Sequence, residues 1–263
     1  MGQKLRTVLI LGSGPDAVRL RRWPRGQFTH IVAINNAWRV HEDWDYLIHP
    51  EDFPPDRWPP AFDPRRQTII TAQSYVPVQN QFGGFVYAGG TMAFTAGYWA
   101  LGELKPDVMA FLGCDMTYEG AKTHFYGRGE PDPLRNDVTL QSLEAKSARL
   151  LAFAALQNCV CVNLSENAHS RLLFPRATPQ LVGSWGKECF TPFLNSQVSA
   201  LDFRQLHSAR QKETSLGYMV ESGKYWEVED RFDAAALREL DRLWLSAAKA
   251  APSIHQKRVG IHA

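Results

Sequence analysis

Residues 8–15 read Val8-Leu9-Ile10-Leu11-Gly12-Ser13-Gly14-Pro15, and no other segment says more about the architecture of this chain. An apolar run that stops at two glycines is typical of a buried parallel strand that turns directly into a helix. The glycines permit a tight turn and a close approach of the backbone, and proline fits the first position of a helix. The segment predicts a phosphate-binding turn formed by Gly12, Ser13 and Gly14; the alternative is a turn that binds no ligand.

The spacing Gly12-x-Gly14-x-x-Ala17 also matches the dinucleotide-binding fingerprint of oxidoreductases. In those enzymes an acidic residue after the second strand binds the ribose hydroxyls, whereas here the second apolar run is followed by Asn35-Asn36. Amide side chains both donate and accept hydrogen bonds, which suits a ribose or the edge of a pyrimidine. The sequence also lacks the Gly-Lys-Ser/Thr of a P-loop. We therefore expect a nucleotide other than NAD, bound in part by Asn35 and Asn36.

Apolar runs recur along the first two thirds of the chain, several of them separated by stretches long enough for a helix. They lie at residues 7–11, 30–34, 45–48, 67–71, 107–112 and 159–164. Residues 91–103, 137–157 and 233–250 show the helical spacing of apolar side chains. This alternation predicts an α/β fold with a mostly parallel, doubly wound, Rossmann-like sheet. We expect residues 1–175 to form the nucleotide-binding domain and residues 176–263 a helical or irregular lid packed on it.

The composition excludes several classes of protein. A chain of 263 residues with 44% hydrophobic residues and a formal net charge of +2 can bury a full core and has no bulk attraction for nucleic acid. The four cysteines lack the spacing of a metal site, and the apolar runs are too short for a secretory signal or a membrane span. We expect no nucleic-acid partner, no metal and a cytoplasmic location. The sequence leaves open whether the protein contacts the inner face of the membrane and whether it forms a homo-oligomer.

Polar side chains gather where the later strands end. Asp115 and Tyr118 follow the run at residues 107–112, and Asn163 and Ser165 lie at the end of the last run. The carboxyl ends of parallel strands meet at the edge where ligands bind in open α/β sheets, so we expect these residues near the first glycine turn. The alternative for Asp115 is a capping role in the next segment.

Two loops add further chemistry. Gly90 and Thr91 form a second glycine turn that opens a helix, whose N-terminus faces the same edge. Residues 122–128 hold His124 and Tyr126 among hydroxyl and cationic groups, a composition suited to proton transfer and anion binding. The alternatives are a histidine satisfied at the surface and tyrosine rings that only cover the core.

The order of these elements resembles glycosyltransferase family 42, the bacterial CMP-sialic-acid-dependent sialyltransferases, and the related domain-of-unknown-function-115 proteins. The resemblance covers residues 5–175. In order along the chain, the matching residues are Gly12, Ser13, Gly14, Pro15, Asn35 or Asn36, Gly89, Gly90, Thr91, Gly113, Asp115, Tyr118, Thr123, His124 and Phe125. The chain departs from the family pattern at Asp16, where the family has a second serine.

The resemblance implies an inverting, metal-independent enzyme that transfers a sialic-acid-like sugar from a CMP-activated donor to a glycan or lipid-linked acceptor, with no other cofactor. It implies that His124 is the general base, that Asp115 binds the ribose or the cytosine, and that Tyr118 and Tyr126 stabilise the leaving phosphate. The residues that it places on the phosphate and sugar of the nucleotide are Ser13, Asn35, Gly90 and Thr91.

Two other classes of function stay open. Archaeal hydroxymethylpterin pyrophosphokinases share the broad fold and transfer a diphosphate from ATP with Mg²⁺; in that class Asp115 and Glu119 are candidate metal ligands. A nucleotide-binding protein without turnover would keep the glycine turns, while the His124 loop would do no chemistry.

Overall fold

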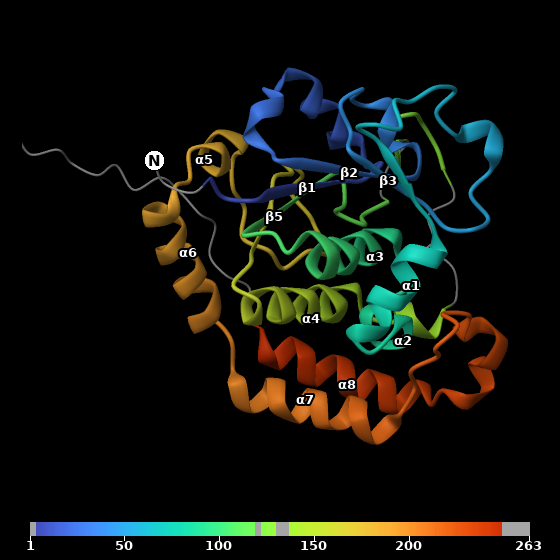
Figure 1. Cartoon of the computed structure of the whole chain (residues 1–263). Helices are drawn as coiled ribbons and strands as arrows, with labels where there is room; N and C mark the ends of the chain where they lie inside the picture. Colours follow the sequence, from blue (N-terminus) through green and yellow to red (C-terminus); the bar gives the residue numbers. More distant parts are fainter. Residues whose placement is uncertain (1–3, 119–121, 130–136, 249–263) are drawn as a thin grey trace, which may run out of the picture.

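The computed structural model describes residues 4–118, 122–129 and 137–248 (Figure 1). Within them six parallel strands form one sheet in the order β4-β3-β2-β1-β5-β6. The strands are β1 (Thr7–Leu11), β2 (His30–Ile34), β3 (Tyr46–Ile48), β4 (Thr68–Ile70), β5 (Val108–Leu112) and β6 (Val160–Asn163). The parallel sheet flanked by helices confirms the predicted α/β, Rossmann-like fold, and each strand lies within one of the six apolar runs.

The sheet buries both of its faces because its central strands consist almost entirely of apolar residues. In β1, Val8 and Ile10 point into one apolar layer, whereas Leu9 and Leu11 point into the other. All four side chains are fully buried. β1 pairs with β2 on one side and with β5 on the other, so it lies at the centre of the sheet.

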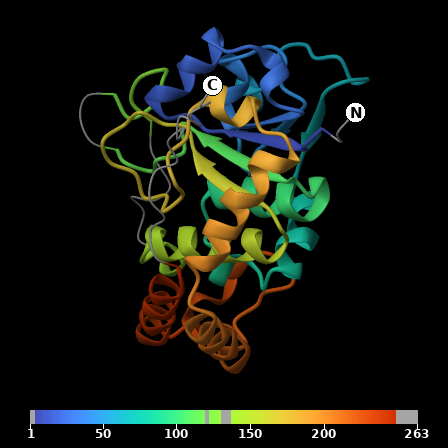
Figure 2. The same cartoon turned by 90° about the vertical axis from the view of Figure 1, so that its left-hand side faces the viewer.

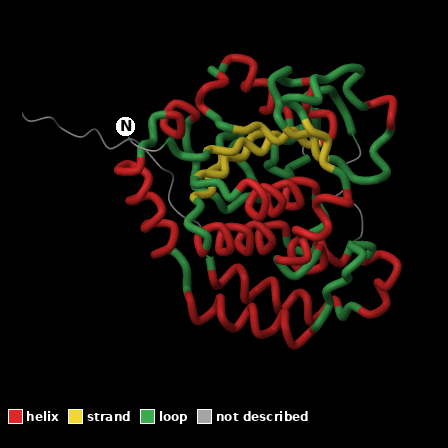
Figure 3. The backbone as a smooth tube through the Cα atoms, viewed as in Figure 1, coloured by secondary structure: helices red, strands yellow, loops and turns green. Residues whose placement is uncertain are grey.

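Helices cover the two faces of the sheet in unequal layers, drawn red on either side of the yellow strands in Figure 3. The face of Leu9 carries η1 (Pro15–Arg22), η2 (Arg25–Gln27), η3 (Asn35–Arg39) and α5 (Pro179–Gly183). The face of Val8 carries α1 (Ala72–Gln81), α2 (Phe85–Ala88), α3 (Met92–Trp99) with its continuation η5 (Ala100–Leu104), and α4 (Leu143–Leu156). Two further short helices are η4 (Pro55–Arg57) and η7 (Val138–Leu140).

The helix predicted over residues 137–157 is divided into η7 and α4 because the sequence contains two caps. The Asp137 side chain accepts from the Thr139 N–H and caps η7, while the Ser142 hydroxyl accepts from the Ala145 N–H at 3.1 Å and caps α4. The helical spacing continues across both segments, so the prediction placed the beginning of the long helix six residues too early.

The chain beyond residue 176 adds a further helical layer. It contains α6 (Lys187–Ser199), α7 (Phe203–Leu216), η8 (Tyr225–Arg231) and α8 (Ala234–Ala247). Figure 1 shows α7 and α8 side by side below α4, and Leu206 and Leu240 belong to the same buried cluster as Leu151 of α4. This extension therefore shares the core of the sheet domain. Among the described helices, none combines the length and the apolar character needed to cross a membrane.

The α6 helix covers the outer edge of the sheet, in front of the edge strand β6 in Figure 2. Its Gln197 side chain is buried and bonds to the strand edge through both ends of the amide. Gln197 Oε1 accepts from the Cys161 N–H at 3.0 Å, and Gln197 Nε2 donates to the Cys159 carbonyl at 2.9 Å. A side-chain amide thus takes the place that a seventh strand would occupy.

A buried charge cluster joins α7 and α8 to α4. The Arg149 guanidinium donates to both oxygens of the Glu213 carboxylate, at 2.7 Å from Nε and 2.9 Å from Nη2. Arg149 also donates to the Tyr98 hydroxyl at 2.8 Å, and Trp244 Nε1 donates to Glu213 Oε1 at 2.8 Å. Because this pair is buried, the loss of either partner leaves an uncompensated charge in the core.

We expect Glu213→Ala to lower the free energy of unfolding by about 3–5 kcal/mol, the usual effect of breaking a buried ion pair. The control is Glu239→Ala, which removes the exposed pair between Lys212 of α7 and Glu239 of α8, at 2.8 Å, and should change stability little. Urea denaturation followed by circular dichroism measures both variants. An equal loss of unfolding free energy in the two variants would contradict the conclusion that the buried cluster stabilises the packing of α7 and α8 on α4.

Candidate functional site

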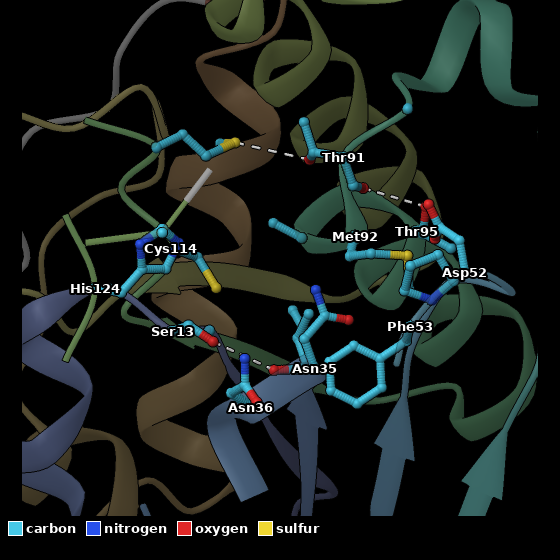
Figure 4. A pocket seen from close by; sticks show the side chains of 18 of the residues that line it. Ser13, Asn35, Asn36, Asp52, Phe53, Thr91, Met92, Thr95, Cys114 and His124 are labelled. Atoms are coloured by element: carbon cyan, nitrogen blue, oxygen red, sulfur yellow. Dashed lines mark hydrogen bonds between the residues drawn. The ribbon is translucent and has the colours of Figure 1, made fainter. Parts of the chain in front are cut away.

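A cavity of about 1380 Å³ opens at the carboxyl ends of the strands, where β1 and β5 lie next to each other. The chain leaves β1 toward β2 and leaves β5 toward β6, so this is the point of the sheet where the strand order reverses. Ligands of open α/β sheets bind at such a point. Figure 4 shows Ser13, Asn35 and Asn36 on one wall, with His124 on one side of the space and Asp52 and Phe53 on the other.

The structure brings together most of the residues that the sequence singled out. Those that line the cavity are Gly12, Ser13, Gly14, Asn35, Asn36, Gly90, Thr91, Asp115, Tyr118, His124 and Tyr126. Asn163 and Ser165 are not among the lining residues, and Glu119 lies outside the described residues.

The first glycine turn is held by the turn that follows β5. The Gly12 N–H donates to the Leu112 carbonyl and the Gly14 N–H donates to the Gly113 carbonyl, both at 2.8 Å. A Cβ on Gly12 would collide with the Gly113 carbonyl oxygen, and one on Gly14 would lie 2.8 Å from the same atom. These glycines therefore allow the turn after β5 to pack closely against the turn after β1. Their N–H groups already have acceptors, so a phosphate at this turn would have to use other donors, such as the Ser13 hydroxyl, whose own contact with the Ile34 carbonyl is long at 3.5 Å.

Asn35 and Asn36 form a polar wall directly after β2. Asn35 has a left-handed backbone (φ 52°), which asparagine tolerates better than most residues. Its Oδ1 atom is buried and accepts no hydrogen bond from the described residues. A buried acceptor without a donor costs about 1–3 kcal/mol, so a ligand N–H or O–H at this atom would recover that energy.

The second glycine turn is fixed by a hydrogen-bonded chain that reaches the carboxyl-terminal extension. The Gly90 N–H donates to the Thr139 hydroxyl at 3.2 Å, and that hydroxyl donates to Asp137 Oδ1 at 2.7 Å. Asp137 Oδ2 accepts from the Tyr225 hydroxyl at 2.7 Å. Next to this turn, the Thr91 side chain caps α3. The cavity wall at Gly90 thus depends on residues more than a hundred positions apart.

Asp115 is a buried carboxylate held by three side-chain donors. Its Oδ1 accepts from Asn163 Nδ2 at 3.1 Å, and its Oδ2 accepts from the Ser165 hydroxyl at 2.5 Å and from Asn167 Nδ2 at 2.7 Å. Asn163, at the end of β6, and Ser165, in the loop after it, therefore orient Asp115 instead of lining the cavity themselves. Arg176 Nη1 lies 3.9 Å from Asp115 Oδ1 and adds a positive charge behind it.

The His124 loop is bonded to the first glycine turn. It is a tight reversal in which the His124 and Gly127 backbones exchange two hydrogen bonds, at 2.9 and 3.1 Å. The Phe125 N–H donates to the Ser13 carbonyl at 3.0 Å, which holds the loop against the end of β1. The glycine turn and the histidine loop thus lie next to each other in the wall of the cavity.

The His124 ring is half-buried between aromatic neighbours. It stacks on Tyr126 with 5.1 Å between ring centroids and lies 5.9 Å from the Tyr118 ring. Burial lowers the pKa of His124 below its ordinary value of 6.5, so the imidazole is neutral at pH 7. Its Nδ1 lies 2.9 Å from the Thr123 hydroxyl, which also accepts from the Gly129 N–H. In the tautomer in which Nδ1 donates to Thr123, Nε2 carries the free lone pair that a general base needs.

Cys114 also lines the cavity, next to Asp115. Its side chain is buried, and burial raises the pKa of its thiol well above the ordinary range, with the Asp115 charge adding to the effect. The thiol is therefore protonated at neutral pH, which argues against a cysteine nucleophile at this site.

Sequence reasoning missed one side of the cavity wall. The missed residues come from the proline-rich loop after β3, from α1 and α2, and from the segment between α7 and α8; they include Glu51, Asp52, Arg57, Tyr75, Phe85, Lys224, Tyr225 and Trp226. No site residue was predicted in the proline-rich stretch at residues 50–60, and Tyr225 and Trp226 lay only within the lid expected at residues 176–263. Neither segment carries a spacing pattern that points to a site.

Comparisons with known proteins add no relative. No protein-family model matches the chain, and neither the curated proteins nor the solved structures gave a significant match.

The contact between the two turns predicts that Gly12→Ala destabilises the protein by about 1–3 kcal/mol, the usual cost of overpacking a buried position. The matched control is Gly26→Ala in η2, where a Cβ would meet no atom within 4 Å. Thermal unfolding in the absence of any ligand measures both. A Gly12→Ala protein as stable as the Gly26→Ala protein would show that the turns do not need this close contact.

Proposed function

We propose that this chain is an inverting glycosyltransferase that moves a sialic-acid-like sugar from a CMP-activated donor to a hydroxyl group of a glycan or lipid-linked acceptor, without a metal. One observation carries the proposal: the half-buried, neutral His124 lies between two tyrosines in the cavity that also holds the amides of Asn35 and Asn36. A base that works near neutral pH and a polar wall for the nucleotide are the two parts that such a transfer needs. The resemblance of the motifs to glycosyltransferase family 42 supports the choice of CMP.

The reaction is a single displacement. The acceptor hydroxyl oxygen attacks the anomeric carbon while the bond from that carbon to the phosphate oxygen of CMP breaks. His124 takes the proton of the hydroxyl and later releases it to water. The departing phosphate gains negative charge, and hydroxyl and cationic side chains stabilise it. Tyr118, Tyr126 and Arg128 line the cavity around His124 and are suited to this task.

The surroundings of Asp115 favour this proposal over a Mg²⁺-dependent phosphotransferase. Both carboxylate oxygens already accept hydrogen bonds from amide or hydroxyl groups, which leaves less of the carboxylate for a cation. EDTA distinguishes the two enzymes, because sugar transfer should persist in its presence and diphosphate transfer should stop. A nucleotide-binding protein without turnover would bind CMP and release no CMP from a CMP-sugar.

We expect CMP to raise the melting temperature more than UMP, AMP or NAD does, since Asn35 and Asn36 replace the acidic residue of NAD-binding proteins. At a hundred times its dissociation constant a ligand stabilises a protein by about 2.7 kcal/mol, which a thermal-shift assay detects. Asn35→Ala or Asn36→Ala should weaken CMP binding by about 1–3 kcal/mol. Asn195→Ala, an exposed position on α6, is the control. An equal shift with NAD, or none with CMP, would reject the donor assignment.

We expect His124→Ala to lower turnover by about 10²- to 10⁴-fold with little change in CMP affinity, because the base acts on the acceptor. The rate needs the neutral imidazole, so it should fall as the pH drops through the pKa of His124, which burial places below 6.5. The control is His207→Ala, an exposed position on α7. Steady-state kinetics between pH 5 and 8 measures both variants. Normal turnover in the His124 variant would assign the base to another residue, and loss of CMP binding would make His124 a phosphate ligand.

A further inference from the structure

The cavity has two chemically different halves. The half described above is polar and includes Ser13, Asn35 and His124. The other half is lined by aromatic rings from three separate segments of the chain. The volume of about 1380 Å³ exceeds the range of about 300–1,000 Å³ that is usual for one small ligand, so there is room for a second substrate beside the nucleotide.

The rings of the second half form a continuous series. Tyr75 of α1 lies 6.2 Å from Phe85 of α2, Phe85 lies 6.3 Å from Tyr225, and Tyr225 lies 5.5 Å from Trp226, all between ring centroids. Tyr75 and Tyr225 are buried, whereas Trp226 is 55% exposed although it lines the cavity. An indole exposed to this degree beside buried rings offers a free flat face to a ligand.

The backbone that leads to Trp226 is held in place by its neighbours. The Tyr225 hydroxyl is anchored on Asp137, and its position leaves no room for a Cβ on Gly90. Gly223 has a left-handed backbone (φ 78°) and packs so closely that a Cβ there would lie 3.0 Å from Val76. The segment before Trp226 is thus fixed against α1 and the Gly90 turn. A ring on a fixed backbone binds a ligand at a lower entropic cost than a ring on a mobile loop.

Charged groups of both signs surround this half. Burial raises the pKa of Tyr75 to about 12, and the negative charges of Glu51 and Asp52 add to this shift because both residues lie near its ring. Arg57 and Lys224 line the same cavity. Carboxylates accept hydrogen bonds only, and the cationic groups donate only. A sugar hydroxyl both donates and accepts, so a polyhydroxylated ring can use the two kinds of group, whereas an ammonium ligand can use only the carboxylates.

We propose that this aromatic half is the acceptor subsite, where a neutral sugar ring stacks on Trp226 and bonds through its hydroxyl groups to the charged rim at Glu51, Asp52, Arg57 and Lys224. The inference rests on the proposed glycosyl transfer, since it supplies the substrate whose hydroxyl His124 deprotonates. The nucleotide occupies the polar half, so the two ligands bind side by side.

Saturation-transfer NMR tests this subsite with methyl β-D-galactoside, methyl β-D-glucoside and choline as probes, each with and without CMP. We expect saturation of at least one glycoside, a signal about tenfold weaker in Trp226→Ala, and partial recovery in Trp226→Phe, which keeps an aromatic face. The control is Phe203→Ala on α7, another exposed aromatic side chain that does not line the cavity. The thermal shift caused by CMP should be the same in all variants.

Several results would overturn the subsite: no glycoside signal in the wild-type protein, an equal signal in Trp226→Ala, or saturation of choline alone, which would indicate a cationic ligand. Loss of the CMP shift in Trp226→Ala would make the ring a platform for the nucleobase. Glycoside binding without CMP binding would leave this subsite standing and reject the CMP donor, so the failures of the two proposals are distinguishable.

Discussion

The Gly113 carbonyl oxygen, in the turn after β5, is the atom on which the geometry of the site depends. It accepts the Gly14 N–H, and the space around it admits no side chain on Gly12 or Gly14. This contact joins the two central strands at their carboxyl ends and so fixes where the His124 loop and the Asn35 wall lie relative to each other. The glycines at positions 12 and 14 thus serve the packing of two turns against each other. The functional groups of the site come from the side chains around these turns.

The fold could be predicted from the sequence because both faces of the sheet are buried. A strand such as β1 or β5 must then be apolar along its whole length, and short apolar runs bounded by glycine or polar residues reveal its limits. The same reasoning placed the strand ends, and with them Asp115, at one edge. Side-chain direction could not be predicted in this way. Asn163 lies at the end of β6, near where Asp115 follows β5, but its side chain bonds to the Asp115 carboxylate.

The aromatic half of the cavity could not be predicted because it depends on long-range packing. Tyr225, at the Gly90 turn, belongs to the segment between α7 and α8, and these helices pack on α4 around the buried Arg149–Glu213 pair. That packing involves a charged residue on α7, a helix whose pattern alone suggests an exposed surface. In the sequence, Trp226 is one aromatic residue in a stretch without periodicity. In the structure, it lines the cavity and keeps much of its side chain exposed.

The amide of Gln197 also bears on how copies of this protein can meet. An open edge strand is a template onto which another chain can add by backbone hydrogen bonding, the first step of sheet-mediated aggregation. Gln197 engages the Cys161 N–H and the Cys159 carbonyl, and the backbone near Arg176 pairs with Asn163 farther along the same strand. The β6 edge is thereby closed to strand addition, while β4, at the opposite edge, is only three residues long. Growth of the sheet at β6 is therefore opposed by contacts that already occupy the hydrogen-bonding groups of its edge.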